Sequence, residues 1–116
     1  MRLRPAALGY ALLGLVVTGC RSTPPPTPLE QLNVQQQAGY TVFQTRCAVC
    51  HYERTDQGKN GPSLAGVFKK PYLHSGAPAT DERVSETVLH GRGMMPAQPY
   101  VDQDELAALL AYLHTV

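Results

Sequence analysis

The sequence predicts an all-α fold of three main helices joined by short turns, on three observations. Residues 33–47 and 102–116 each begin with Asn or Asp, and Gln or Glu follows three positions later, as in a capping box. Residues 80–91 begin with Thr, continue with two acidic residues and close on Gly, which favours a short helix. No segment alternates apolar and polar residues as a half-buried strand does.

The first and last expected helices have faces suited to each other. Gly39, Phe43 and Cys47 recur at intervals of four and share one helix face. Because Gly39 is costly in a helix interior, we expect another backbone to approach it closely. The last helix carries an apolar stripe that predicts core packing: Leu106, Leu109, Leu110 and Leu113. We expect Tyr112 to pack on the first helix.

The chain begins like a bacterial export signal. Arg2 and Arg4 precede an apolar run, residues 6–17, which is shorter than the about 20 residues of a membrane span. The run ends in Val-Thr-Gly-Cys20, which resembles the lipobox of bacterial lipoproteins. Cleavage before Cys20 leaves a lipidated N-terminal cysteine. The alternative is an ordinary secretory signal, with Cys20 left as a free thiol.

On the first interpretation, residues 1–19 are a removed signal peptide, residues 20–32 are a lipidated cysteine with a linker, and residues 33–116 are the folded domain. Four prolines between residues 24 and 28 forbid a helix and favour polyproline II. As a free spacer, residues 21–32 would reach about 37 Å, at about 3.1 Å per residue. That length would hold the domain about one diameter from a membrane.

The charge balance does not suit nucleic-acid binding. Removing Arg2 and Arg4 from the ten basic residues leaves eight, against nine acidic ones. The chain shows no internal repeat and has room for one domain.

Three side chains able to bind a metal or cofactor stand close together in Cys47-Ala48-Val49-Cys50-His51. A Cys-x-x-Cys-His string is typical of c-type haem attachment. Two cysteines on one side of a tight turn can each form a thioether with a haem vinyl group, and His51 then supplies an axial ligand. A thioredoxin-like redox pair would need a βαβ context, and a zinc site would need a second ligand pair. Neither accompanies the motif.

One covalent haem c would also enlarge the apolar core of the domain. A domain the size of residues 33–116 buries a marginal apolar area. We therefore expect the haem to supply part of the core, and the haem-free chain to be largely unfolded.

Met94 and Met95 are the candidates for the second axial position, because thioether ligation opposite His suits electron transfer. Pro96 biases Met95 to an extended backbone, which suits a side chain directed from a loop toward a metal. Met94 would then cover the haem edge or pack in the core. Without a haem, both would be simple gap fillers.

Together these features resemble the class I cytochromes c over residues 33–116. The signatures stand in family order: Gly39-x-x-x-Phe43-x-x-x-Cys47, Cys47-Ala48-Val49-Cys50-His51, Gly61-Pro62-Ser63-Leu64-Ala65-Gly66-Val67-Phe68, Gly93-Met94-Met95-Pro96-Ala97 and Leu109-x-x-Tyr112. The resemblance implies a small cytochrome c fold wrapped around one covalently attached haem, with Met95 as the second axial ligand. It also implies that the Pro62 carbonyl accepts a hydrogen bond from His51 and fixes its ring. An ordinary turn at Gly61-Pro62 is compatible with that role.

The remaining polar side chains have less specific roles. We expect His74, His90 and His114 at the surface, with His114 at a frayed C-terminus. Four side chains have donors suited to haem propionates, and the sequence does not choose among them: Tyr72, Arg83, Arg92 and Tyr100. Other cations would form either a basic rim that steers a redox partner or ordinary solvated charge: Arg54, Lys59, Lys69, Lys70 and Arg92.

Three functions fit these residues. The first is a membrane-tethered periplasmic electron-transfer protein that shuttles one electron, as Fe(II)/Fe(III), between redox partner proteins of a respiratory chain. The second is a haem c subunit of a larger periplasmic oxidoreductase complex. The third is an open-site haem gas sensor or peroxidase, which requires that neither methionine binds.

The sequence contains no nucleophile–base pair, so we expect no catalysis by the polypeptide itself. We expect a monomer or complex subunit on the periplasmic side of a bacterial membrane, lipid-anchored through Cys20.

Overall fold

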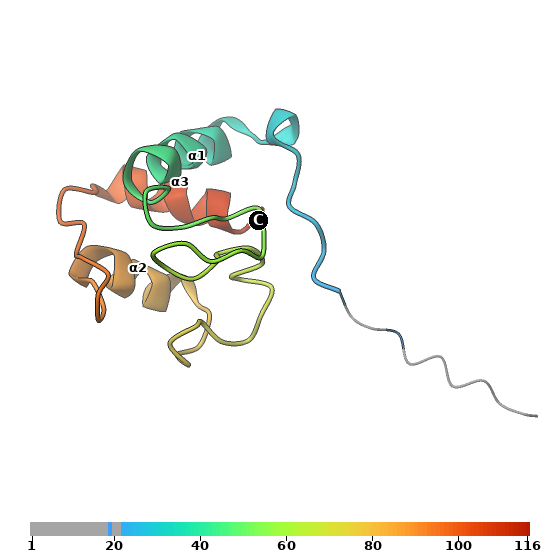
Figure 1. Cartoon of the computed structure of the whole chain (residues 1–116). Coiled ribbons are helices and arrows are strands. Elements are labelled where there is room, and N and C mark those ends of the chain that lie inside the picture. Colours follow the sequence, from blue (N-terminus) through green and yellow to red (C-terminus); the bar gives the residue numbers. More distant parts are fainter. Residues whose placement is uncertain (1–18, 20–21) are drawn as a thin grey trace, which may run out of the picture.

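A computed structural model describes residue 19 and residues 22–116. Its elements follow in the order η1 (Leu29–Gln31), α1 (Val34–Arg46), α2 (Asp81–His90) and α3 (Gln103–Leu113), and the described residues form no β-strand. Figure 1 shows α1 lying across α3, with α2 on another side of α3 and a long loop segment between α1 and α2. The prediction of an all-α fold with three main helices is confirmed.

The helix ends form for the local reasons that the sequence indicated. Asn33 accepts a hydrogen bond from the Gln36 amide at 2.8 Å, and the Gln36 side chain accepts one from the Asn33 amide at 3.0 Å. The same reciprocal pair opens α3. Thr80 caps α2 through its hydroxyl oxygen, and Gly91 ends that helix with a φ of 75°. These contacts satisfy backbone groups that have no partner inside the helix.

The core is centred on the crossing of α1 and α3. A Cβ on Gly39 would overlap the Ala108 carbonyl and lie 2.7 Å from the Tyr112 Cβ, so only glycine permits this approach. Tyr112 is fully buried, and its ring centroid lies 6.0 Å from that of Phe43. The predicted close approach at Gly39 and the predicted packing of Tyr112 are confirmed. The other core side chains are apolar: Leu32, Val42, Val84, Val88, Val101, Leu106, Leu109, Leu113 and Val116.

The C-terminal residues contradict the prediction of a frayed end. Helix α3 stops at Leu113, but Thr115 and Val116 are only 6% and 1% exposed. The His114 ring stacks on Phe68 with centroids 3.9 Å apart, and its Nε2 lies 2.7 Å from Asp81 Oδ1. These partners come from distant parts of the chain, so a helical pattern near the terminus could not indicate them.

The proline-rich segment contradicts the prediction of a free spacer. The Thr27 amide donates to the Thr115 carbonyl at 2.7 Å, and Arg54 Nη2 donates to the Thr27 carbonyl at 2.7 Å. Leu32 is 7% exposed and belongs to the core. Figure 1 shows the segment, in blue, running along the domain beside the C-terminus.

The expected signal peptide falls almost entirely on residues that the structure does not describe, and so does Cys20. Among the helices of the described residues, none has the length and apolar character needed to cross a membrane.

Candidate functional site

Cys47, Cys50 and His51 lie in a tight turn that continues directly from α1. Cys47 is the C-cap of the helix, and its amide donates to the Phe43 carbonyl at 2.8 Å. The amides of Cys50 and His51 both donate to the Cys47 carbonyl at 3.0 Å. Both cysteines are half-buried free thiols. The end of α1 therefore presents two thiols and an imidazole within five consecutive residues.

His51 is oriented by the Gly61-Pro62 turn. Its Nδ1 lies 2.8 Å from the Pro62 carbonyl oxygen, which is the contact that the resemblance implied. An imidazole that donates from Nδ1 keeps the lone pair of Nε2 free for a metal. Gly61 leaves room for the ring, because a Cβ there would overlap Cε1 and lie 2.8 Å from Nδ1. The ring is 9% exposed, so the surrounding chain determines its direction.

Further hydrogen bonds fix the loop that carries Pro62 to the attachment turn. The Gly61 amide donates to the Cys50 carbonyl at 2.7 Å, and the Leu64 amide donates to the Tyr52 carbonyl at 2.8 Å. Lys59 Nζ donates to the Ala48 carbonyl at 2.9 Å. Residues 47–64, which we call the attachment segment, are therefore held together by their own chain.

Glu53 is a buried residue of this site that sequence reasoning missed. It is 7% exposed, and its Oε1 accepts from the Tyr112 hydroxyl at 2.9 Å and from Gln44 Nε2 at 3.2 Å. Burial raises the pKa of Tyr112 well above its ordinary range, although the nearby Arg54 guanidinium opposes this shift, and the Glu53 carboxylate raises the pKa further. The contact joins the attachment segment to both α1 and α3. In the sequence Glu53 looks like a surface charge, because its partners lie on two helices.

The environment of Cys47 bears on its reactivity. Burial raises the pKa of its thiol from 9.0 to about 11, although the neighbouring Arg46 charge opposes this shift. The thiolate, which is the nucleophilic form of cysteine, is therefore scarce at neutral pH in the folded chain without a thioether.

The two methionines are placed very differently by a short turn. Arg92 and Met95 exchange backbone hydrogen bonds of 3.0 and 2.9 Å, and Gly93, between them, has a φ of 55°. Met94 is at the tip of this turn and is fully exposed, whereas Met95 is half-buried. The Gln98 amide donates to the Val88 carbonyl at 2.8 Å and so fixes the loop to α2.

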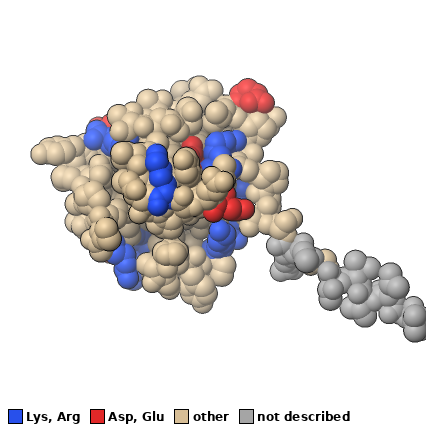
Figure 2. Space-filling view, in the orientation of Figure 1, with Lys and Arg blue, Asp and Glu red and all other residues tan. Residues whose placement is uncertain are grey.

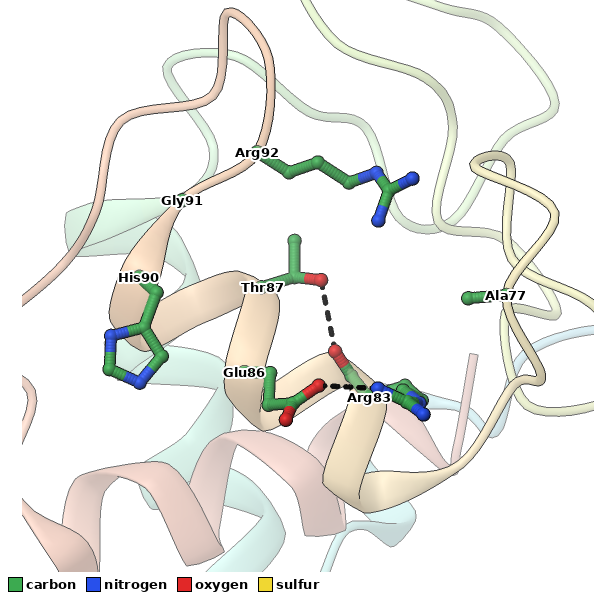
Figure 3. Close-up of a pocket in the computed structure, with 7 residues that line it drawn as sticks. All are labelled: Ala77, Arg83, Glu86, Thr87, His90, Gly91 and Arg92. Carbon is green, nitrogen blue, oxygen red and sulfur yellow. Dashed lines mark hydrogen bonds and ion pairs between the residues drawn. The ribbon is translucent and has the colours of Figure 1, made fainter.

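A small cavity lies beside α2, between that helix and the loop around Ala77. Figure 3 shows Arg83 and Arg92 on its wall, with both guanidinium groups on the side that faces Ala77. Arg83 Nη1 donates to Glu86 Oε2 at 2.8 Å, so one of the two positive charges is partly neutralised. Two of the four suggested propionate donors thus share one cavity, and all four have exposed side chains.

The cations of the suggested basic rim differ in their surroundings. Arg54 is half-buried, and its Nη2 donates to the Thr27 carbonyl of the proline-rich segment. Lys59, Lys69 and Lys70 are exposed. On the face in Figure 2, blue and red side chains are interspersed and no patch of one sign dominates. His74, His90 and His114 are exposed, as predicted.

The donors of this site fit one covalently attached haem c. Cys47 and Cys50 supply two thiols for thioethers, and His51 presents a free Nε2 because Pro62 occupies Nδ1. Met95 supplies a half-buried thioether from the loop after α2. Among the described residues, no group of three or more His, Cys, Asp or Glu gathers to hold a separate metal ion.

Comparison with known families agrees with this fit. The family model described as cytochrome c oxidase, cbb3-type, subunit III matches residues 34–113. The match spans more than half of the 116 residues and includes the attachment segment and both methionines of the loop.

Proposed function

Because this chain belongs to the family of c-type cytochromes described as cytochrome c oxidase, cbb3-type, subunit III, we propose that it is a membrane-tethered periplasmic electron carrier. The domain binds covalently attached haem c, and its chemistry is haem-based electron transfer. The bound haem supplies a one-electron Fe(III)/Fe(II) couple.

The attachment segment would hold the haem from one side. Cys47 and Cys50 form the thioethers, and His51 Nε2 is the axial ligand. The observation that carries this assignment is the 2.8 Å contact between His51 Nδ1 and the Pro62 carbonyl. That contact selects the tautomer with a free Nε2, fixes the ring and raises its basicity as a ligand.

Met95 would close the opposite side as the second axial ligand. Its half-burial supports this role, and the full exposure of Met94 argues against the neighbouring residue. Pro96 supports it too, because the residue before a proline is biased to an extended backbone. A thioether opposite an imidazole raises the reduction potential and suits a carrier.

The proposal of a membrane tether comes from the sequence. Val17-Thr18-Gly19-Cys20 after an apolar run resembles a lipobox, so Cys20 would carry lipid on the periplasmic side of a bacterial membrane. Mass spectrometry of the mature protein tests it. Lipid mass on Cys20 supports the tether, and an unmodified Cys20 contradicts it.

A second candidate function is a haem c subunit of a larger oxidoreductase complex. The description of the matching family names an oxidase subunit, and this is the observation that supports the second candidate. The electron-transfer chemistry would be the same, but the partner would be permanent. Isolation from membranes in mild detergent separates the two, because a subunit copurifies with a catalytic partner and a free carrier does not.

The optical spectrum of the purified haem protein, oxidised and reduced, with and without CO, tests the proposed carrier. Two protein ligands predict a low-spin spectrum that CO leaves unchanged. A high-spin spectrum that shifts with CO would indicate an open iron, and gas sensing or peroxide chemistry would replace electron transfer.

A further inference from the structure

The proline-rich residues 22–28, which we call the strap, are bound to the domain at several points. The Thr27 amide and carbonyl make hydrogen bonds of 2.7 Å to Thr115 and Arg54 respectively. Lys69 Nζ donates to the Pro24 carbonyl at 3.4 Å. These contacts come from the C-terminus, the attachment segment and the loop that follows it.

Gly66 gives the strap a close contact near its start. Gly66 is buried, has a φ of 64°, and a Cβ on it would lie 2.5 Å from the Thr23 methyl group. The three successive prolines after Thr23 have no amide hydrogen to leave unsatisfied, and their stiffness lowers the entropy lost on binding. The strap is therefore suited to lie on a surface in one conformation.

The strap shortens the free part of the chain between domain and anchor. Thr23 stands three residues after Cys20, and three extended residues span at most about 11 Å. A free linker over residues 21–32 would span about 37 Å. This difference in the length of the free linker determines whether the domain contacts the membrane that holds its anchor.

From these contacts we propose that the surface around Gly66, Lys69 and Lys70 is seated on the phospholipid headgroups of the membrane that holds Cys20. This inference rests on the proposed lipidation of Cys20. The strap leads the chain to this corner of the domain, and the remaining residues are too few to carry it away. Lys69 and Lys70 are exposed there, with Nζ atoms 3.4 Å from the Pro24 carbonyl and 3.2 Å from the Ala65 carbonyl, and their positive charges would lie next to the headgroup phosphates.

The charges near the strap are mixed, so seating depends on the strap more than on attraction to lipid. Asp56 lines the same cavity between strap and domain as Arg54 and Gly66. Figure 2 shows both red and blue side chains near the point where the described chain continues into the grey residues. Substitutions that break the strap contacts should therefore change the seating.

The test uses the lipidated holoprotein in vesicles of phosphatidylcholine with a minority of phosphatidylglycerol. A nitroxide is attached at Pro71→Cys, beside Lys70, or at Gln103→Cys, at the start of α3. The strap lies at the other end of α3, about 16 Å away along a helix of this length. Collisions of each nitroxide with Ni(II) held on chelating lipid headgroups are then measured. We expect a collision rate several-fold higher at residue 71 than at residue 103.

Two substitutions at one position link this difference to the strap. Thr27→Pro removes the amide hydrogen that bonds Thr115, and we expect the two collision rates to become similar. Thr27→Ala keeps the backbone hydrogen bonds, and we expect the wild-type difference.

Similar rates at residues 71 and 103 in the wild-type strap, with lipid mass present on Cys20, would overturn the seating and leave the proposed function intact. Absence of that lipid mass would overturn both the tether and the seating. An unchanged difference in Thr27→Pro would also overturn the role of the strap.

Discussion

The attachment segment, residues 47–64, and the methionine loop, residues 91–101, are built differently, although each supplies one axial ligand in our proposal. In the attachment segment, hydrogen bonds link Cys50 to Gly61 and His51 to Pro62, and Glu53 is buried against α1 and α3. In the methionine loop, the hydrogen bonds are those between Arg92 and Met95 and single backbone bonds from Gly91 to Thr87, from Gln98 to Val88 and from Val101 to Gln98.

This difference indicates how the two sides of the haem would be held. The chain itself orients His51, because its acceptor and the space around its ring are fixed by neighbouring backbone. The hydrogen bonds that the described part of the methionine loop makes join backbone groups and leave the Met95 side chain unbonded, so its place would depend more on the bound haem. A region with fewer buried contacts opens at a lower free energy than the rest of the fold.

The largest effect should follow from Cys47→Ala combined with Cys50→Ala, which removes both thioethers. We expect the haem-free chain to be largely unfolded and to lose most of its helical circular dichroism, because the small domain then lacks part of its core. Cys20→Ala is the matched control, since it leaves both haem cysteines in place. A haem-free chain that still unfolded cooperatively would show that the hydrogen bonds of the attachment segment suffice without the haem.

Gly61→Val should be the most damaging single change in the attachment segment. Its side chain would overlap the His51 ring, and overpacking of this kind costs about 3 kcal/mol of unfolding free energy. Gly58→Val, in the same loop, is the control, because a Cβ there meets no atom closer than 3.8 Å. Urea unfolding followed by haem absorbance measures both. Equal stability of the two variants would contradict the tight fit around His51.

Tyr112→Phe tests the contact between the attachment segment and the helices. It leaves Glu53 Oε1 with Gln44 as its remaining partner. Because a buried carboxylate then lacks one hydrogen bond, we expect the unfolding free energy to fall by about 2 kcal/mol. Urea unfolding at neutral pH measures the loss. A variant as stable as the wild type would show that Glu53 does not tie the attachment segment to α3.

The same residue gives a pH dependence with a defined sign. Burial raises the pKa of folded Tyr112 above its ordinary value of 10.0, so the unfolded chain loses this proton first as the pH rises. The contribution of the Tyr112 hydroxyl to the unfolding free energy is fully present below pH 10 and is lost as the pH rises above it. We expect the unfolding free energy of the wild type to fall more steeply above that pH than that of Tyr112→Phe. Parallel pH profiles would contradict the burial of the hydroxyl.

Gly93→Ala should have the smallest effect on stability, because a Cβ there meets open space and only its φ of 55° is unfavourable. We expect a loss of about 1 kcal/mol. Gly76→Ala is the control, since its φ of 85° is also positive and its surroundings are also open. The two should differ in CO binding, which increases in Gly93→Ala because the turn that places Met95 is disturbed. Equal CO binding would show that this turn does not position the ligand.

Local patterns were sufficient to predict the helices. The caps at Asn33, Thr80 and Asp102 depend on residues three positions apart, and all three form as expected. The packing of Gly39 on α3 was also predictable, because an interior helical glycine is costly unless a neighbour needs the space. The attachment motif was equally local, since Cys47, Cys50 and His51 are nearly adjacent.

Most of the contacts that sequence reasoning missed join distant residues through single side chains. Glu53 is buried by Tyr112, which is 59 residues away, and Arg54 bonds the backbone of Thr27, 27 residues away. His114 finds partners in Phe68 and Asp81. None of these pairs has a periodic pattern, and the charged side chains look like ordinary surface residues.

The most direct test of the account compares Met95→Ala with Met94→Ala in the reduced haem protein exposed to CO. The two substitutions remove the same side chain from adjacent positions, one half-buried and one fully exposed. We predict that Met95→Ala binds CO and shows the spectrum of an open site, whereas Met94→Ala behaves like the wild type. CO binding in Met94→Ala alone, or in neither variant, would contradict the assignment of Met95 as the ligand opposite His51.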